Sequence, residues 1–185
     1  MNRFVSSAVA GAFALAGLAT VALAANPEVG GAPMDPTKNI VENAMNSKEH
    51  TTLVAAVKAA GLADTLQGAG PFTVFAPVNA AFDALPAGTV DTLLKPENKE
   101  QLTKVLTCHV IPAKAMSADV IKMVKDDGGA HKVTSVGGCE LTLKADGGNV
   151  TVTDENGNAA TVIIADVDQS NGVIHVVDKV LLPKM

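Results

Sequence analysis

Hydrophobic residues recur every three or four positions through most of the first two thirds of this chain. This is the spacing of helices that pack one face against a core. Leu53, Val54 and Val57 lie on one such face, and Gly61 follows at a position typical of a helix end. The pattern predicts helices from Asp35-Pro36 to Met45 and over residues 50–60, 62–66, 79–85, 90–94, 101–107 and 117–126.

Alternating hydrophobic and polar residues replace this pattern near residue 130. Gly137-Gly138, Gly147-Gly148 and Asn156-Gly157 separate the alternating segments, and such pairs are typical of β-hairpin turns. Helices first and strands later favour an α+β domain, so we expect a helical layer packed against a β-sandwich or wedge. The predicted strands are residues 72–77, 132–136, 140–144, 150–153, 160–164 and 173–182.

The first 24 residues have the layout of a secretory signal peptide. Arg3 precedes an almost continuous apolar run from Phe4 to Leu23, and Ala22-Leu23-Ala24 is a small-x-small cleavage site. A membrane anchor is the alternative, because the run is about long enough to span a bilayer. We expect a signal peptide over 1–24, a linker over 25–36, one domain over 37–185, and an exported protein in the periplasm or the medium.

The composition argues against several classes of partner. The chain has a formal net charge of −5, no Trp or Tyr, and a single arginine, Arg3. Nucleic-acid binding relies on clustered Arg and Lys with stacking aromatic residues, and binding of sugars also leans on exposed aromatic rings. We therefore expect a protein or cell-surface polymer as partner, no nucleic acid, and no membrane span once the leader is removed.

Two cysteines, Cys108 and Cys139, remain for the exported chain. An even number of cysteines in an exported protein favours a disulfide, and closing this loop would stabilise the fold by about 3.5–4 kcal/mol. Two buried free thiols are the alternative.

Polar residues suggest chemistry at few places. Asp154, Asn156 and Asn158 have the spacing that opens a calcium loop, but Ala159 and Ala165 stand where that loop requires Gly and Glu, so a hairpin explains them better. The sequence contains no nucleophile elbow, phosphate-binding loop or helical zinc motif. We expect neither an enzyme nor a metal or other cofactor.

The four histidines divide into two pairs. His50 precedes a predicted helix and His131 a predicted strand, so we expect both to be exposed. His109 and His175 each interrupt an apolar segment read as a strand. A buried, hydrogen-bonded ring is the favoured interpretation, and a ligand or catalytic base is the alternative.

Three separated motifs resemble those of fasciclin domains. They are residues 73–82 (TVFAPVNAAF), residues 106–112 (LTCHVIP) and residues 170–182 (SNGVIHVVDKVLL). The first and last are similar to the two homology blocks of that family, and the middle one to its central Tyr-His strand. The resemblance extends from about Asn39 to Pro183 and is closest to single-domain exported bacterial members.

The resemblance implies an adhesion module. Animal matrix members attribute partner binding to the Tyr-His strand and to an Asp-Ile dipeptide ahead of the second block, which correspond here to Cys108-His109 and Asp166-Val167. Cys108 and Val167 depart from that pattern. We interpret the remaining signature residues as structural: Asn79, Asn171, Gly172, His175 and Asp178.

Two hypotheses for function follow. The first is an exported fasciclin-type module that binds a protein or a cell-envelope or matrix polymer through its surface, without a cofactor. The second is a periplasmic protein that binds a small apolar ligand in a gap between the helices and the sheet.

Overall fold

The computed structural model describes residues 26–184. The predicted signal peptide, residues 1–24, lies outside the described residues. The helices are α1 (Ile40–Asn46), α2 (Thr51–Ala60), α3 (Ala63–Gln67), α4 (Asn79–Asp83), α5 (Thr89–Leu93), the 3-10 turn η1 (Pro96–Asn98), α6 (Lys99–Cys108) and α7 (Ser117–Asp126). The strands are β1 (Glu28–Val29), β2 (Ala32–Pro33), β3 (Phe72–Pro77), β4 (Val110–Ile111), β5 (His131–Thr134), β6 (Glu140–Asp146), β7 (Asn149–Thr153), β8 (Ala159–Gln169) and β9 (Gly172–Val177).

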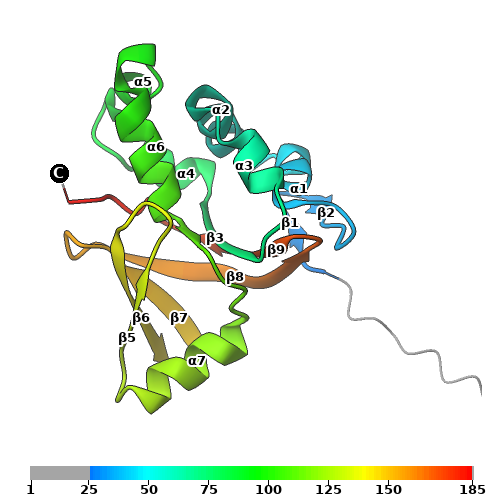
Figure 1. Ribbon diagram of the computed structural model, residues 1–185, viewed down its shortest axis with the longest axis vertical. Coiled ribbons are helices and arrows are strands. Elements are labelled where there is room, and N and C mark those ends of the chain that lie inside the picture. The colour runs from blue at the N-terminus through cyan, green and yellow to red at the C-terminus, as the bar shows by residue number, and fades with distance from the viewer. Residues whose placement is uncertain (1–25, 185) are drawn as a thin grey trace, which may run out of the picture.

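Within residues 26–184, strands β3 to β9 form one seven-stranded sheet in the order β4-β3-β9-β8-β7-β6-β5. Helices α1 to α6 gather on one side of it, whereas α7 lies at the opposite end beside β6 and β7 (Figure 1). The predicted α+β architecture, a helical layer against a β wedge, is therefore confirmed.

The long strand β8 turns the sheet into a wedge. Its first residues pair with β7 and its later residues with β9, and its register shifts between Val162 and Ile164 and again between Ile164 and Val167. Such bulges bend a strand and increase its twist. Two hydrophobic clusters result: one between β3, β9 and the helices α1 to α6, and one between the two halves of the sheet and α7.

Strands β3 and β9 are parallel neighbours near the β4 edge of the sheet, with Phe72 opposite Gly172 and Pro77 opposite Val177. Both strands are buried almost throughout, as expected of apolar strands covered on both faces. The pair begins at a close backbone contact. A Cβ on Gly172 would meet the carbonyl oxygen of Phe72, so only glycine fits there.

The first helix begins later than the sequence predicts. Asn39 caps α1 by accepting a hydrogen bond from the N–H of Glu42 (3.0 Å), and Glu42 bonds back to the N–H of Asn39 (3.0 Å). Asp35 forms a local turn with Thr37 instead (2.9 Å).

The segment expected to be a linker also has structure. Residues 28–33 form the β1–β2 hairpin, and Val29 and Met34 are buried in the helical core. Two-residue strands are too short for the alternation of a longer strand to appear, so local sequence does not reveal them.

Two predicted strands have different lengths in the structure. The strand expected over 160–164 continues to Gln169, and the strand expected over 173–182 ends at Val177. Continuation through Asp166 depends on the bulges of β8, and these arise from pairing with β9. None of the described helices is long and apolar enough to cross a membrane.

Replacing Gly172 by alanine tests the close contact at the start of the parallel pair. The added methyl group forces β9 away from β3, so we expect the free energy of unfolding to fall by about 1–3 kcal/mol. Urea denaturation measures it. Ser170→Ala, at an exposed position two residues earlier, is the control and should stay within about 0.5 kcal/mol of the parent protein. Equal stability of Gly172→Ala and the parent would contradict the contact.

Candidate interaction site

The side chain of Asn79 holds the start of a helix that lies earlier in the chain. Its Oδ1 accepts a hydrogen bond from the N–H of Thr52 (3.1 Å) in the first turn of α2, and its Nδ2 donates to the carbonyl of Lys48 (2.9 Å). The ring of His50, which precedes α2, bonds to Ser47 instead (2.9 Å), so Asn79 supplies the cap. Asn79 is itself the first residue of α4, so it caps α2 and not the helix that it begins.

Asn171 plays a similar part at the turn between β8 and β9. Its Oδ1 accepts from the N–H of Ile40 (3.1 Å), the first residue of α1. Its Nδ2 donates to the carbonyls of Leu66 (2.7 Å) and Gly68 (3.0 Å) at the end of α3. One amide side chain thus ties two helices to the sheet.

Two carboxylates also form hydrogen bonds that connect segments far apart in the chain. Asp178 accepts from the N–H of Thr161 (2.7 Å) and so joins the end of β9 to the start of β8. Asp154 accepts from the N–H groups of Asn156, Asn158 and Leu182, each at 2.9 Å. The segment that resembled a calcium loop is therefore a hairpin turn whose carboxylate is already bound by backbone N–H groups.

His175 is a buried ring with two partners. Its Nδ1 accepts from the N–H of Asp166 (3.2 Å), and its Nε2 donates to the carbonyl of Ala115 (2.8 Å). The ring also stacks on Phe75, with centroids 5.8 Å apart. Burial lowers the pKa of His175, and the bond to Ala115 opposes that shift. His175 is therefore a neutral ring that joins β8 and β9 to the segment before α7.

His109 is 2 % exposed and both its nitrogens are bound. Nε2 accepts from the N–H of Leu181 (2.9 Å), so Nδ1 carries the proton and donates to the carbonyl of Val105 (2.8 Å). Burial lowers its pKa to about 4. The prediction that His109 interrupts a strand is wrong, because it follows the last turn of α6. The buried ring does not reach the surface where a partner would bind.

The dipeptide Asp166-Val167 divides between surface and core. Val167 is fully buried. Asp166 is half-buried, has a φ of 59°, and accepts hydrogen bonds from the N–H (2.6 Å) and the hydroxyl of Ser117, the first residue of α7. Beyond them on the surface, Asp168 pairs with Lys114 (2.5 Å), each side chain 41 % exposed. Of the three residues expected to bind a partner, Asp166 alone reaches solvent.

The contact between Ser117, Asp166 and His175 differs from a catalytic triad. The serine hydroxyl bonds to the carboxylate, and the imidazole bonds to backbone groups on both sides. A nucleophilic serine needs a base that accepts its proton, and here the ring is committed to other partners. Across residues 26–184, no three His, Cys, Asp or Glu side chains group in a way that could hold a metal ion.

The structure joins Cys108 and Cys139 in a disulfide, with Cα atoms 5.4 Å apart. Cys108 is the last residue of α6, so the disulfide attaches the end of this helix to the turn before β6. Cys108 and His109 were expected on one strand. This is wrong, because Cys108 ends α6 and His109 follows directly after it.

The other two histidines differ in exposure. His131 is partly exposed and bonds to Asp127 (2.5 Å). His50 was expected to be exposed but is 2 % exposed, and within residues 26–184 its Nε2 has no hydrogen-bond partner. Burial lowers the pKa of His50, and the nearby Ala76 carbonyl opposes that shift. The β1–β2 hairpin covers this ring with Val29 and Met34, which sequence alone did not indicate.

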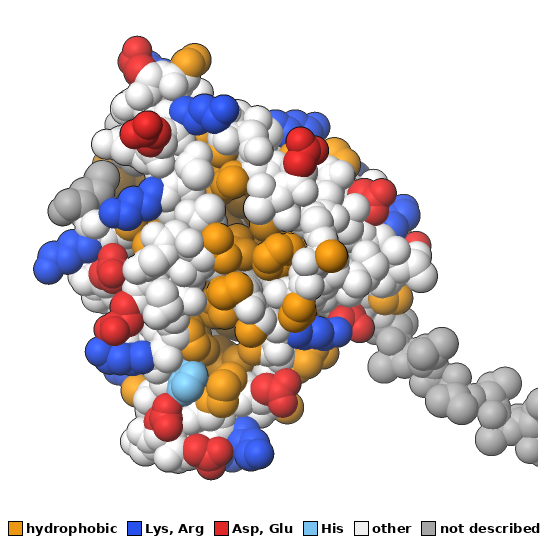
Figure 2. All heavy atoms as spheres, in the orientation of Figure 1, with side chains coloured by type: hydrophobic (Ala, Val, Ile, Leu, Met, Phe, Trp, Pro, Cys, Tyr) orange, Lys and Arg blue, Asp and Glu red, His pale blue; other side chains and the backbone are white. Residues whose placement is uncertain are grey.

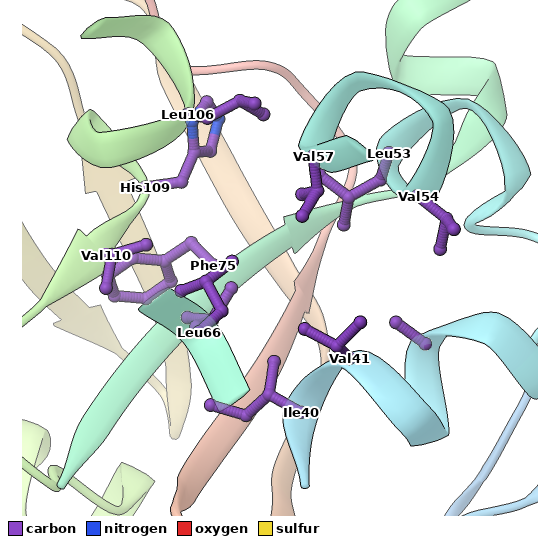
Figure 3. Close-up of a pocket in the computed structure, with 12 residues that line it drawn as sticks. Ile40, Val41, Leu53, Val54, Val57, Leu66, Phe75, Leu106, His109 and Val110 are labelled. Atoms are coloured by element: carbon purple, nitrogen blue, oxygen red, sulfur yellow. The ribbon is translucent and has the colours of Figure 1, made fainter. Parts of the chain in front are cut away.

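An apolar cleft runs between the helices α1 to α3 on one side and α6 with β4 on the other (Figure 3). Side chains from all these elements point into it. Figure 2 shows hydrophobic side chains in a continuous band down the middle of this face, with charged side chains on both sides. The inner section of the cleft is lined by Ile40, Val41, Leu53, Val57, Leu106 and His109, among others.

The space between these walls, including the mouth, is about 450 Å³. The free volume inside the cleft is about 30 Å³. The cleft is therefore closed to a narrow slot. Sequence indicated the apolar face of α2 but not that α6 leaves part of it uncovered.

The fold and the tied signature residues define an α+β wedge domain, and comparison with known proteins agrees. The fasciclin domain model matches residues 48–183. The chain is 49 % identical to Protein sll1483 of Synechocystis sp. over 99 % of this chain and 97 % of that protein. It is 35 % identical to Immunogenic protein MPB70 of Mycobacterium bovis, over 86 % and 77 % of the two chains. The chain belongs to the fasciclin domain family.

A solved structure shares the fold. It is a domain pair from the insect cell adhesion molecule Fasciclin I, with a TM-score of 0.68 and 18 % identity. The match covers 78 % of this chain and 51 % of that one.

Acid should destabilise the protein through its buried histidines. A ring whose pKa is about 4 when folded and about 6.5 when unfolded binds more protons in the unfolded state, so stability falls as pH drops from 6.5 to 4. His109 alone should account for about 3 kcal/mol. Denaturant titrations at pH 7, 5.5 and 4 measure this loss.

His109→Asn should flatten that pH dependence, although it also lowers stability at pH 7 by removing a buried bond. Ser170→Ala, which changes an exposed side chain that does not titrate, is the control and should keep the slope of the parent. If the free energy of unfolding of the parent protein is the same at pH 7 and pH 4, the conclusion that these histidines are buried and neutral is wrong.

Proposed function

We propose that this protein is an exported adhesion module that binds a partner protein or a cell-envelope polymer through its surface. Membership of the fasciclin domain family carries the proposal, since the match spans residues 48–183. The shared fold with part of an insect cell adhesion molecule supports it. The role needs no cofactor, because recognition uses protein side chains.

Export is part of the proposal. We propose that residues 1–24 are a signal peptide and that the mature protein works in the periplasm or outside the cell. The disulfide between Cys108 and Cys139 supports this, because disulfides persist in oxidising compartments.

N-terminal sequencing tests export directly. Protein recovered from the periplasm or the culture medium of its own host should begin at Ala25. A mature protein that still begins at Met1 would contradict cleavage.

We place the contact surface at Asp166, Asp168 and Lys114. Asp166 and Asp168 lie on either side of the buried Val167, and Lys114 extends the patch through its ion pair with Asp168. His109 and Val167 support the fold beneath the surface and make no contact with the partner. The patch carries acidic side chains and a lysine, so it favours a partner with the opposite charge facing each of them. Salt screens such contacts, so association should weaken as salt is added.

Attachment of beads coated with the purified protein to cells of its own host tests this surface. Lys114→Ala with Asp168→Ala should reduce attachment several-fold and leave stability almost unchanged, since exposed ion pairs contribute about 0–1 kcal/mol. The matched control is Lys132→Ala with Glu140→Ala, which removes another exposed ion pair (2.7 Å) elsewhere in the domain.

The outcomes separate two claims. Equal attachment by both double variants and the parent would show that the contact surface lies elsewhere. Equal attachment by coated and uncoated beads would contradict adhesion itself.

A further inference from the structure

We propose that the apolar cleft between α1–α3 and α6–β4 binds one straight-chain fatty acid. The alkyl chain would lie in the cleft and the carboxylate at Lys99. This site is separate from the charged surface formed by Asp166, Asp168 and Lys114.

The inner section of the cleft offers only apolar contacts. Its lining is aliphatic apart from Phe75 and His109. Both nitrogens of His109 are bound to Val105 and Leu181, so the ring contributes no free donor or acceptor. A polar group placed there would lose its hydrogen bonds to water without replacement, which costs about 1–3 kcal/mol. The part of a ligand inside the cleft is therefore hydrocarbon.

The cleft continues outward as a second apolar section. Leu66 and Val110 line both sections, and the outer one adds Leu62, Phe72 and Val136. Val136 is 47 % exposed, so the band reaches solvent at this end. Figure 2 shows the band as continuous along the face. Contiguous exposed apolar surface on a soluble domain commonly marks a binding site.

The small free volume of the cleft limits the kind of hydrocarbon that it can take. This volume is about 30 Å³ in the inner section and about 20 Å³ in the outer one. A single methylene chain enters such a slot by displacing side chains, whereas a ring system or two chains side by side would require the helices to separate. A free fatty acid fits this limit better than a two-chain phospholipid.

Lys99 supplies the charge at the outer end. Its ammonium lies over the end of α2, 3.5 Å from where a Cβ on Gly61 would be. Gly61 directly precedes Leu62, which lines the outer section. Within residues 26–184, the ion pairs are those of Lys114, Lys132 and His131, so Lys99 is available for a carboxylate.

Isothermal titration calorimetry of the purified protein with lauric acid tests the site. We expect a 1:1 complex. Titration with 1-dodecanol, which has the same chain without the charge, should give weaker binding. Sedimentation with phosphatidylglycerol vesicles distinguishes a membrane from a single fatty acid, and we expect the protein to remain in the supernatant.

Two substitutions should close the outer section. Val136→Trp changes an exposed side chain and should leave the fold intact, and Leu62→Trp fills the slot from the other wall. Each should weaken lauric acid at least tenfold. Ile163→Trp is the matched control, because Ile163 is 51 % exposed on β8 and lies outside the cleft, so affinity should stay within twofold.

Lys99→Gln tests the contribution of the lysine charge to binding separately from that of the alkyl chain. It should weaken lauric acid about threefold and leave 1-dodecanol unchanged, as expected for a solvent-exposed ion pair. The proposal is overturned if lauric acid fails to bind, if Val136→Trp and Ile163→Trp bind it equally well, or if the protein sediments with vesicles while ignoring the free acid.

Discussion

The parallel pairing of β3 with β9 is the constraint on which the rest of the structure depends. It brings together two segments that are about a hundred residues apart in the chain and aligns Phe72 with Gly172. Once these strands are paired, the turns at their ends lie against the ends of helices. Asn79, after β3, reaches α2, and Asn171, before β9, reaches α1 and α3. The polar residues of the two signature motifs therefore position the helical layer on the sheet.

This arrangement explains why the strongest family motifs are poor candidates for the binding surface. Backbone N–H groups at helix starts need acceptors, and here several acceptors come from distant side chains. Replacing such a residue leaves a helix end unpaired, and it disturbs the fold before it affects any partner. His109 belongs to the same class, since it connects α6 to the segment after β9 through Leu181. The side chains of Asp168 and Lys114, which lie on the surface next to these ties, cap no helix, and we therefore propose them as part of the contact surface.

Much of the fold could be predicted from local pattern, because a helix or strand of six or more residues shows its own periodicity. Phe72–Pro77 and the helix from Ser117 to Asp126 have the predicted bounds. Asn171 and Asp178, which the sequence indicated as structural residues, bind backbone N–H groups of other elements. Tertiary features could not be predicted. The partner of Asn79, the burial of His50 beneath a hairpin, and the space left open beside α2 depend on how elements far apart in sequence meet.

Native-state hydrogen exchange followed by NMR tests the central claim most directly. N–H groups in the first turn of a helix ordinarily exchange quickly, because they have no partner within the helix. We predict that those of Ile40, Thr52 and Ser117 exchange only through global unfolding, as slowly as the N–H groups of β9, because side chains from distant segments bind them. Exchange at the rate of exposed helix ends would contradict the account and would leave the signature residues without the structural role assigned to them.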